Sequence, residues 1–254
     1  MKNKIITIVL TLTICMISSY AVFGTENTDA LTANSEKNEE IEITNSEYDL
    51  LQTPNVLSKK NIEETEELSK SVEEYLENKI TTKSSGGKTL SVSTIKQNNG
   101  HYCGPACIDM VMNYFGTNYT QSYIAQQCGT NNSGTIVYKI RNFLNSKLNS
   151  SHQYKYVYTS QIHFSQGLIY SIDKNRPVIC HTKTNDLSYY NGHISWHYIL
   201  ARGYYYGYNN SGGTYYVKLS DPNNNNAYYG RHIVTYSEIN NAINGNAGLY
   251  IMGK

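Results

Sequence analysis

A cysteine followed directly by glycine and proline stands out in the segment QNNGHYCGPACIDMVMNYFG, residues 97–116. Pro105 suits the first turn of a helix, because the backbone N–H that proline lacks has no partner there. Cys103 is therefore expected at the start of a helix, where unpaired N–H groups and the helix dipole favour thiolate over thiol. Cysteines so placed beside a histidine titrate at roughly 3.5 to 7.5 rather than near 8.5. Such a thiolate attacks carbonyl carbons, although a capping or disulfide cysteine would have the same local sequence.

A cysteine nucleophile needs a base, and His197 is the best placed of the seven histidines. It opens the apolar run HYILARGY, which predicts a buried strand that would hold the imidazole rigidly. Asp221 ends the next predicted strand, TYYVKLSD, after the GYNNSGG loop. If the two strands pair as a hairpin, the end of the second returns to the start of the first, and Asp221 lies beside His197. The alternatives are an ordinary Asp-Pro turn and a sheet histidine without a catalytic role.

Acyl transfer also requires hydrogen-bond donors for the charge that develops on the carbonyl oxygen. The backbone N–H of Cys103 is one candidate, and the side-chain amide of Gln97, six residues upstream, is another. Gln97 would otherwise be an ordinary loop residue. His193 and His197 lie four residues apart, but on a predicted strand and without the glutamate of a zinc-protease helix. We therefore expect neither a metal ion nor a cofactor.

The elements that must position these residues are helical first and extended later. Apolar residues recur at helical spacing in four segments, and six Tyr-, Val- and Ile-rich runs bounded by Gly, Asn and Pro read as strands. This order predicts an α+β fold, in which N-terminal helices that carry the nucleophile pack on a mainly antiparallel β-sheet. The expected helices are 103–116, 120–129, 136–148 and 168–175, and the expected strands are 154–159, 176–182, 195–207, 214–221, 232–236 and 248–253.

The first 24 residues have a lysine-bearing start, an apolar run and then small residues, which is typical of a secretory signal peptide. A membrane anchor is the alternative interpretation. No later segment is apolar enough to span a bilayer. We therefore expect the mature protein to be exported, in a secreted or cell-wall-associated form, and without an integral membrane segment once the signal peptide is removed.

Residues 25–88 differ in charge from the remainder of the chain. They contain 15 acidic and 7 basic residues, a balance of −8, whereas residues 89–254 contain 5 acidic and 12 basic residues, a balance of +7. Opposite charges on two halves of one chain indicate that the halves meet. We expect residues 25–88 to be a propeptide or linker that acts as an intramolecular inhibitor of the domain at 89–254. An acidic solubilising linker is the alternative.

One amphipathic helix is expected within this acidic segment, at about residues 61–80, with Asn61 as its cap and Glu64 completing a capping box. Its apolar stripe is Ile62, Leu68, Val72, Tyr75, Leu76 and Ile80. The following TTKSSGGK reads as a flexible linker that is open to proteases. Its Gly86-Gly87 pair raises the hypothesis of self-cleavage after Gly87.

Four cysteines remain outside the predicted signal peptide: Cys103, Cys107, Cys128 and Cys180. An exported protein permits disulfides, but the sequence does not determine any pairing. Cys107 lies one turn after Cys103 and is expected to face the interior. The basic residues of the domain are scattered and no nucleic-acid-binding motif is present, so we expect no nucleic-acid partner.

The segments QNNGHYCGPA, SWHYILARGY and KLSDPN resemble the three motif blocks of the papain-like cysteine peptidases, and are most similar to the bacteriocin-leader (double-glycine) branch, the peptidase C-39-like family. The resemblance covers roughly residues 91–252. It implies a papain-like fold with Cys103 as nucleophile, His197 as general base and acid, Asp221 as the residue that orients His197, and Gln97 as oxyanion donor. True leader peptidases of this branch are usually fused to an export ATPase in the cytoplasm, whereas this chain begins with a signal-type segment. We therefore expect a task other than bacteriocin-leader processing.

Three functions fit these observations. The first is an exported cysteine peptidase, made as a proform, that hydrolyses peptide or protein substrates through a thioester acyl-enzyme. The second is an amidase or transpeptidase that acts on cell-wall peptides or conjugates with the same residues. The third is a non-catalytic papain-like binding module, for which a damaged triad would be expected.

Overall fold

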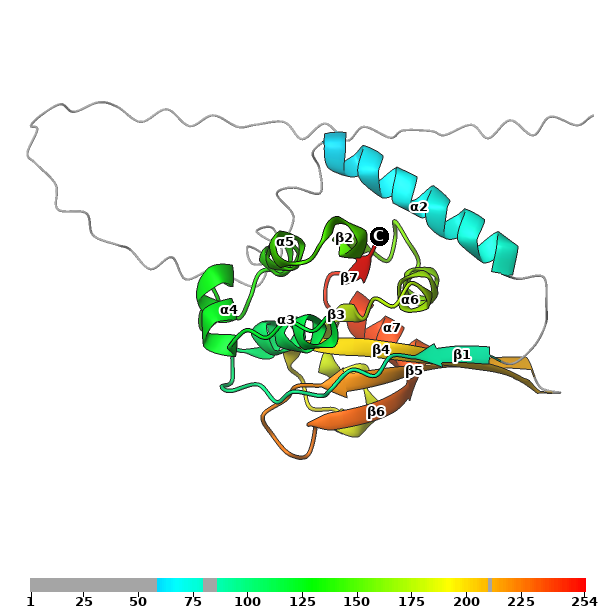
Figure 1. The fold of residues 1–254 in the computed structure, drawn as a ribbon. Coiled ribbons are helices and arrows are strands. Elements are labelled where there is room, and N and C mark those ends of the chain that lie inside the picture. The colour runs from blue at the N-terminus through cyan, green and yellow to red at the C-terminus, as the bar shows by residue number, and fades with distance from the viewer. Residues whose placement is uncertain (1–58, 80–85, 210–211) are drawn as a thin grey trace, which may run out of the picture. The chain divides into compact units, whose positions relative to one another are not determined.

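A seven-stranded sheet, antiparallel at every pairing, is the centre of the structure (Figure 1). The computed structural model describes residues 59–79, 86–209 and 212–254. The strand order is β2-β7-β3-β4-β5-β6, and β1 pairs separately with β4. The strands are β1 (Gly86–Thr89), β2 (Tyr154–Tyr158), β3 (Val178–Lys183), β4 (Trp196–Asn209), β5 (Gly212–Asp221), β6 (Gly230–Thr235) and β7 (Leu249–Gly253).

Strand β4 organises the sheet because it is long enough to take three partners. Its first half pairs with β3 and its second half with β1, both along the same side. Along the other side it pairs with β5, but only from Leu200 onward. Residues 196–199 therefore extend past the end of β5, and among the described residues no strand covers that side of them. This short uncovered stretch of β4 is where His197 lies.

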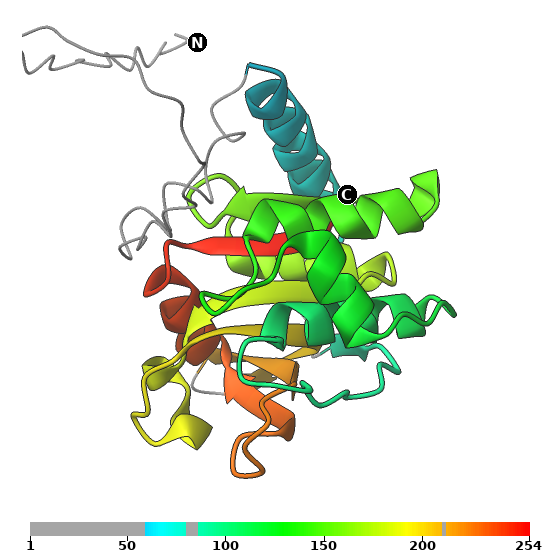
Figure 2. The ribbon, with the colours of Figure 1, turned by 90° about the vertical axis from the view of Figure 1, so that its left-hand side faces the viewer.

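Helices lie on both sides of the sheet. Figure 2 shows α3, α4 and α5 on one side and α7 on the other. Local sequence signals define several ends: the Thr120 side chain caps α4, Gly129 ends it in the left-handed conformation, and Thr235 and Glu238 form a capping box at the start of α7. The helices after β1 are α3 (Cys103–Tyr114), α4 (Gln121–Cys128), α5 (Val137–Lys147), α6 (Phe164–Asp173) and α7 (Tyr236–Asn244).

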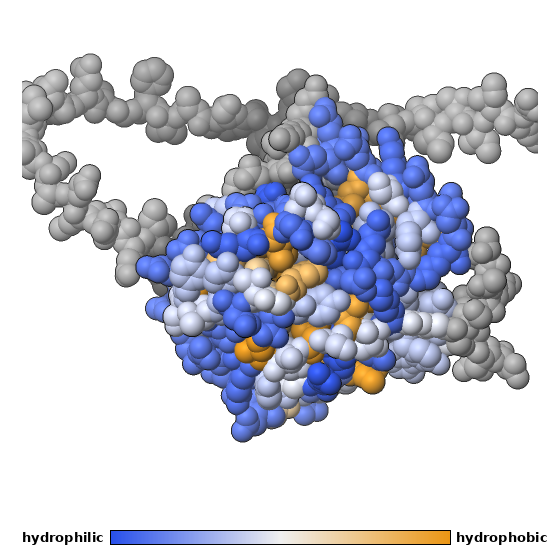
Figure 3. All heavy atoms as spheres, viewed as in Figure 1, coloured by the Kyte–Doolittle hydropathy of each residue, from blue (hydrophilic) through white to orange (hydrophobic). Residues whose placement is uncertain are grey.

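The core is continuous and apolar, and the sheet strands contribute much of it. Strands β3 and β7 are buried along almost their whole length, as expected for strands covered on both faces. Cys107 is fully buried, as predicted, and Cys103, Cys107, Cys128 and Cys180 are all free thiols. Hydrophobic side chains on the face shown in Figure 3 appear in small groups separated by polar residues.

Helix α2 (Lys59–Lys79) packs on α6, and its start and its buried face differ in detail from those predicted. It begins two residues before Asn61, the predicted cap. Leu68 and Val72 of the predicted apolar stripe are buried, but Ile62 is 42% exposed. At the C-terminal end of α2, Lys79 forms an ion pair with Asp173 of α6. Helix α2 also meets the domain through an ion pair of the predicted sign, since Glu64 lies 2.9 Å from Lys155 of β2.

The double glycine also differs from the expected open linker. Gly86 and Gly87 belong to β1, where Gly87 lies opposite Tyr205 of β4. A Cβ at Gly87 would lie 2.4 Å from the Tyr204 carbonyl oxygen, so the close approach of the two strands requires glycine. The predicted boundary between Lys88 and Thr89 therefore falls inside β1.

The predicted signal peptide and the acidic stretch before α2 lie outside the described residues. Within the described ranges, no helix is both long and apolar enough to cross a lipid bilayer.

Candidate active site

Cys103 is the first residue of α3, as the Gly-Pro sequence after it predicted. The N–H groups of this turn have no acceptor within the helix, and the Gly104 N–H hydrogen-bonds the Cys103 sulfur. A second backbone donor is the N–H of Tyr198, from the part of β4 that extends past β5. Cys103 as a residue is only 7% exposed, so these donors act on its sulfur with little competition from water.

His197 hydrogen-bonds the Cys103 sulfur with its side chain. Burial on its own would raise the pKa of Cys103, but the hydrogen bond and positive charge of His197, together with the two backbone donors, bring that pKa below its usual value. Burial likewise disfavours the charged imidazole, but the charge and hydrogen bond of Asp221, followed by those of Cys103, raise the pKa of His197 to about 10. At neutral pH this arrangement favours a thiolate–imidazolium ion pair.

Asp221 lies beside His197, as the hairpin prediction required. Its Oδ1 is 2.8 Å from Nε2 of His197, and the carboxylate is fully buried. Since Nε2 is occupied by Asp221, the other ring nitrogen, Nδ1, is the one left for Cys103. Burial alone would raise the pKa of Asp221, but the charge and hydrogen bond of His197 lower it, and the N–H of Asn223 and the hydroxyl of Tyr190 lower it further. The carboxylate also accepts the Asn223 N–H at 2.8 Å, so the Asp-Pro turn and the histidine contact coexist.

A β-bulge in β4 puts Asp221 and His197 on the same face of the sheet. Between the hairpin loop and Gly203, β4 and β5 keep one register, in which Gly203 lies opposite Lys218. From Ala201 toward the start of β4 the register is shifted by one residue, so that Leu200 lies opposite Ser220 instead of Asp221. The side chains of opposite residues share a face, and the face alternates along a strand. Without the shift, Asp221 would share the face of Leu200, and His197 would point away from it.

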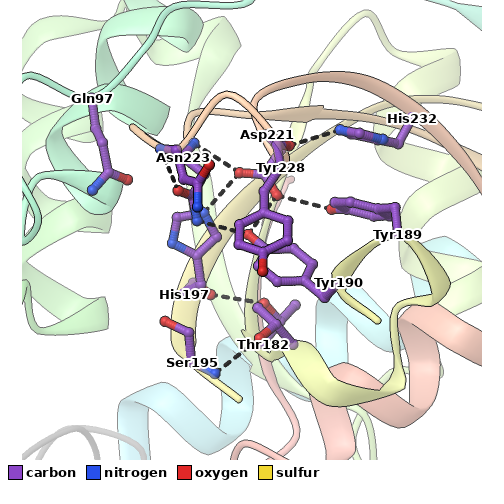
Figure 4. A network of polar contacts seen from close by, with 12 residues as sticks. Gln97, Thr182, Tyr189, Tyr190, Ser195, His197, Asp221, Asn223, Tyr228 and His232 are labelled. Atoms are coloured by element: carbon purple, nitrogen blue, oxygen red, sulfur yellow. Dashed lines mark hydrogen bonds and ion pairs between the residues drawn. The ribbon is translucent and has the colours of Figure 1, made fainter. Parts of the chain in front are cut away.

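Gln97 is buried near the end of β5. Its backbone N–H donates to the carbonyl oxygen of Pro222, the residue after Asp221. Its Nε2 donates one hydrogen to the Asn99 carbonyl oxygen at 2.7 Å, which leaves the second hydrogen of the amide for another acceptor. In Figure 4 the amide lies on the opposite side of His197 from Tyr189 and His232. The structure thus brings all four predicted site residues into one region.

The contacts of Asp221 include residues that the sequence did not single out. Tyr189 and Tyr190 both donate hydrogen bonds to its Oδ2, at 2.9 and 2.8 Å (Figure 4). They lie in a loop between β3 and β4, and no sequence pattern distinguishes them from the many other tyrosines of the chain. Thr182 of β3 fixes the backbone at the site from the other side, because its hydroxyl donates to the His197 carbonyl oxygen at 2.9 Å.

Comparison with protein-family models assigns the chain to a family. The model described as the Peptidase_C39 like family matches residues 89–244. The chain belongs to that family. Its members are cysteine peptidases, so the predicted enzyme class and the papain-like α+β fold are both confirmed. Comparison with curated proteins gave no match.

Three solved structures are similar to this member of the Peptidase_C39 like family. The double-glycine-motif protease from an AMS/PCAT transporter, in complex with the leader peptide, is 16% identical and has a TM-score of 0.41. The match covers 66% of this chain and 94% of that one. The peptidase domain of Streptococcus ComA is 19% identical with a TM-score of 0.42, and the match covers 63% of this chain and 95% of that one. A putative C39-like peptidase from Bacillus anthracis is 14% identical with a TM-score of 0.46, and the match covers 66% of this chain and 98% of that one.

Proposed function

We propose that this cysteine peptidase is exported as a proform and hydrolyses peptide bonds with Cys103, His197, Asp221 and Gln97. The observation that carries the proposal is the continuous chain of hydrogen bonds from the Cys103 sulfur through His197 to Asp221. A nucleophile, a proton carrier and an orienting carboxylate in hydrogen-bond contact are what thiol-dependent acyl transfer needs.

The first half of the reaction forms a thioester. The Cys103 thiolate attacks the scissile carbonyl carbon, and the carbonyl electron pair moves onto oxygen. The free hydrogen of Gln97 Nε2 and the N–H of Cys103 are the donors available to stabilise this oxyanion. As the oxyanion collapses, the carbon–nitrogen bond breaks and Nδ1–H of His197 protonates the leaving amine. The acyl group stays on sulfur, and His197 is left neutral.

The second half regenerates the enzyme. Neutral His197 takes a proton from a water molecule, whose oxygen attacks the thioester carbon. The carbon–sulfur bond then breaks, which releases the new carboxyl end of the product and restores the thiolate beside the imidazolium. Asp221 remains ionised throughout, and it keeps Nε2–H in place while Nδ1 loses and regains its proton.

Export and the proform rest on the N-terminal region. The signal-type segment at residues 1–24 supports export, and the acidic segment that follows supports a propeptide that inhibits the basic domain. The docking of α2 on α6, with ion pairs from Lys79 to Asp173 and from Glu64 to Lys155, supports an association of the two parts. Self-cleavage after Gly87 would require β1 to separate from β4, with which Gly87 is paired. N-terminal sequencing of the mature protein tests this hypothesis directly, and a mature protein that begins elsewhere would contradict it.

The test uses the full chain under a mild reductant, with a proteome-derived peptide library as probe. Mass spectrometry should find new peptide ends with the wild type and none with Cys103→Ala or His197→Ala. His152→Ala is the matched control and should cleave normally, because this half-buried histidine packs on Phe115 at the end of α3 opposite Cys103. Cleavage that persists in Cys103→Ala would refute the proposal. A Cys103 that reacts with iodoacetamide in an enzyme that cleaves no peptide would instead favour an amidase or transpeptidase.

A further inference from the structure

The loop between β3 and β4 is tightly closed at its base, immediately before His197. The Thr184 N–H donates to the Ser195 carbonyl oxygen at 3.0 Å, and the Ser195 N–H donates to the Thr184 hydroxyl at 2.9 Å. The same hydroxyl donates to the His193 carbonyl oxygen at 2.8 Å. Thr184 is fully buried, so these bonds are shielded from water. A loop held in this way can present its side chains with a fixed geometry.

Two neighbouring tyrosines of this loop bind the same oxygen of Asp221. Their hydroxyls donate to Oδ2, whereas His197 Nε2 and the Asn223 N–H occupy Oδ1. An ionised carboxylate has about four acceptor positions, and here all are filled by donors from the protein. The Asn223 side-chain amide also donates to the Tyr190 hydroxyl at 3.0 Å, so the hydroxyl proton of Tyr190 must point to Asp221.

The rings of both tyrosines are themselves held in place. Tyr189 stacks on His232 of β6 with ring centroids 3.7 Å apart, and Tyr190 stacks on Tyr228 at 4.3 Å. Residue 188 is anchored as well, since its N–H donates to Glu238 in the capping box of α7 at 3.0 Å. The position of the two hydroxyls is therefore set by three separate parts of the fold.

We propose that Tyr189 and Tyr190 are positioning residues that act on catalysis through Asp221. By filling Oδ2, they leave Oδ1 as the oxygen that faces His197 and they prevent rotation of the carboxylate. Among the described residues, neither tyrosine is hydrogen-bonded to Cys103. Tyr190 also packs edge-on against the His197 ring, with centroids 6.4 Å apart, and phenylalanine would keep that packing. This inference rests on the proposed function, because it assigns the tyrosines a part in that reaction.

The test compares Tyr189→Phe and Tyr190→Phe with the wild-type full chain. Each variant removes one hydroxyl and keeps the stacked ring. We expect kcat on a quenched fluorescent peptide from the library screen to fall roughly tenfold for each variant, as for one lost hydrogen bond to a charged group, with KM nearly unchanged. The matched control is Tyr170→Phe, a buried tyrosine of α6, which should behave as wild type.

A second readout separates positioning from a merely structural role. The rate of Cys103 alkylation by iodoacetamide is followed against pH, and its acid limb should move to higher pH in Tyr190→Phe. The acid limb reports formation of the Cys103 thiolate, which the imidazolium of His197 stabilises. The Tyr190 hydroxyl is one of the donors that lower the pKa of Asp221, so without it Asp221 protonates more readily as the pH falls and supports the imidazolium less. In an Asp221→Asn background, the same tyrosine changes should cost little more, because residues that act through one another are not additive.

The outcomes are distinct. Wild-type kcat and an unmoved acid limb in both phenylalanine variants would overturn the inference and leave the proposed function intact. Full additivity with Asp221→Asn would also overturn it. A wild type whose Cys103 neither cleaves nor alkylates would refute the proposed function, and the inference with it. If one single variant does not fold, the other still carries the test, since both hydroxyls donate to the same oxygen.

Discussion

Replacing Asp221 by asparagine removes the charge that keeps His197 protonated and changes few atoms. The amide oxygen can still accept from Nε2 of His197, so the ring orientation is retained. In the wild type, Asp221 is the largest of the influences that raise the pKa of His197 from 6.5 to about 10. The variant therefore tests whether the electrostatics of the site follow from this one contact.

The size of the effect follows from the geometry. The two side chains are in hydrogen-bond contact at 2.8 Å and both are buried. Unit charges about 4 Å apart at an effective dielectric constant of about 20 attract with about 4 kcal/mol, which corresponds to roughly 3 pKa units. We expect the pKa of His197 to fall by about that amount in Asp221→Asn, to near neutrality.

The assay is NMR titration of histidine-labelled full-length protein, which needs no substrate. Wild-type His197 should stay protonated to about pH 9, whereas the variant ring should titrate around neutral pH, and the alkaline limb of kcat/KM should shift with it. Asp109→Asn, a change to a half-buried aspartate on α3, is the control and should leave His197 unaffected. A variant His197 that is still protonated at pH 9 would refute the electrostatic account of the site.

The same shift has a signature in stability. The folded-state pKa of His197 lies above its ordinary value of 6.5, so the stabilisation by this group is complete below about pH 6.5 and is lost as the pH rises through about 10. In urea unfolding, the difference between wild type and Asp221→Asn should therefore shrink across that interval. A difference that grows with pH would contradict the assigned direction.

Three further predictions concern other parts of the molecule. Gln97→Ala should lower kcat on the screened peptide roughly 100- to 1,000-fold with little change in KM, as for loss of an oxyanion donor, and a loss below about tenfold would argue against that role. Gly87→Ala would place a Cβ 2.4 Å from a β4 carbonyl oxygen and should lower the free energy of unfolding in urea by about 1–3 kcal/mol, whereas Gly100→Ala, with open space around it, should not. Leu68→Ala, in the buried stripe of α2, should cost about 2–5 kcal/mol in the same assay, while the exposed Glu66→Ala should cost almost nothing.

Local signals in the sequence were sufficient to predict most elements and the start of the key helix. Gly104 and Pro105 placed Cys103 in the first turn of α3, because the preference of proline for that turn depends only on its own backbone. The strands were found from runs of β-branched and aromatic residues. The prediction was weakest for the segment before Thr89, where glycine and serine read as a linker but Gly86 and Gly87 form a strand. Glycine there serves a close contact with β4, and such a contact is invisible in the segment alone.

The two tyrosines that hold Asp221 show a different limit. Tyr189 and Tyr190 lie in a loop without periodicity, in a chain with 25 tyrosines, and nothing nearby in the sequence marks them. Their role depends on a loop that folds back over the end of a strand about 30 residues later. Only the folded chain reveals such a pairing.

The sequence by itself determined which residue types are present for thiol chemistry and in what order, and it predicted that a hairpin would return Asp221 toward His197. The tertiary structure decided that the two side chains face each other. The β-bulge between Ala201 and Gly203 shifts the register by one residue, and because side chains alternate between faces, one residue is the difference between contact and separation. A glycine within a strand is consistent with a bulge, but only the pairing on both sides of β4 fixes where the shift occurs.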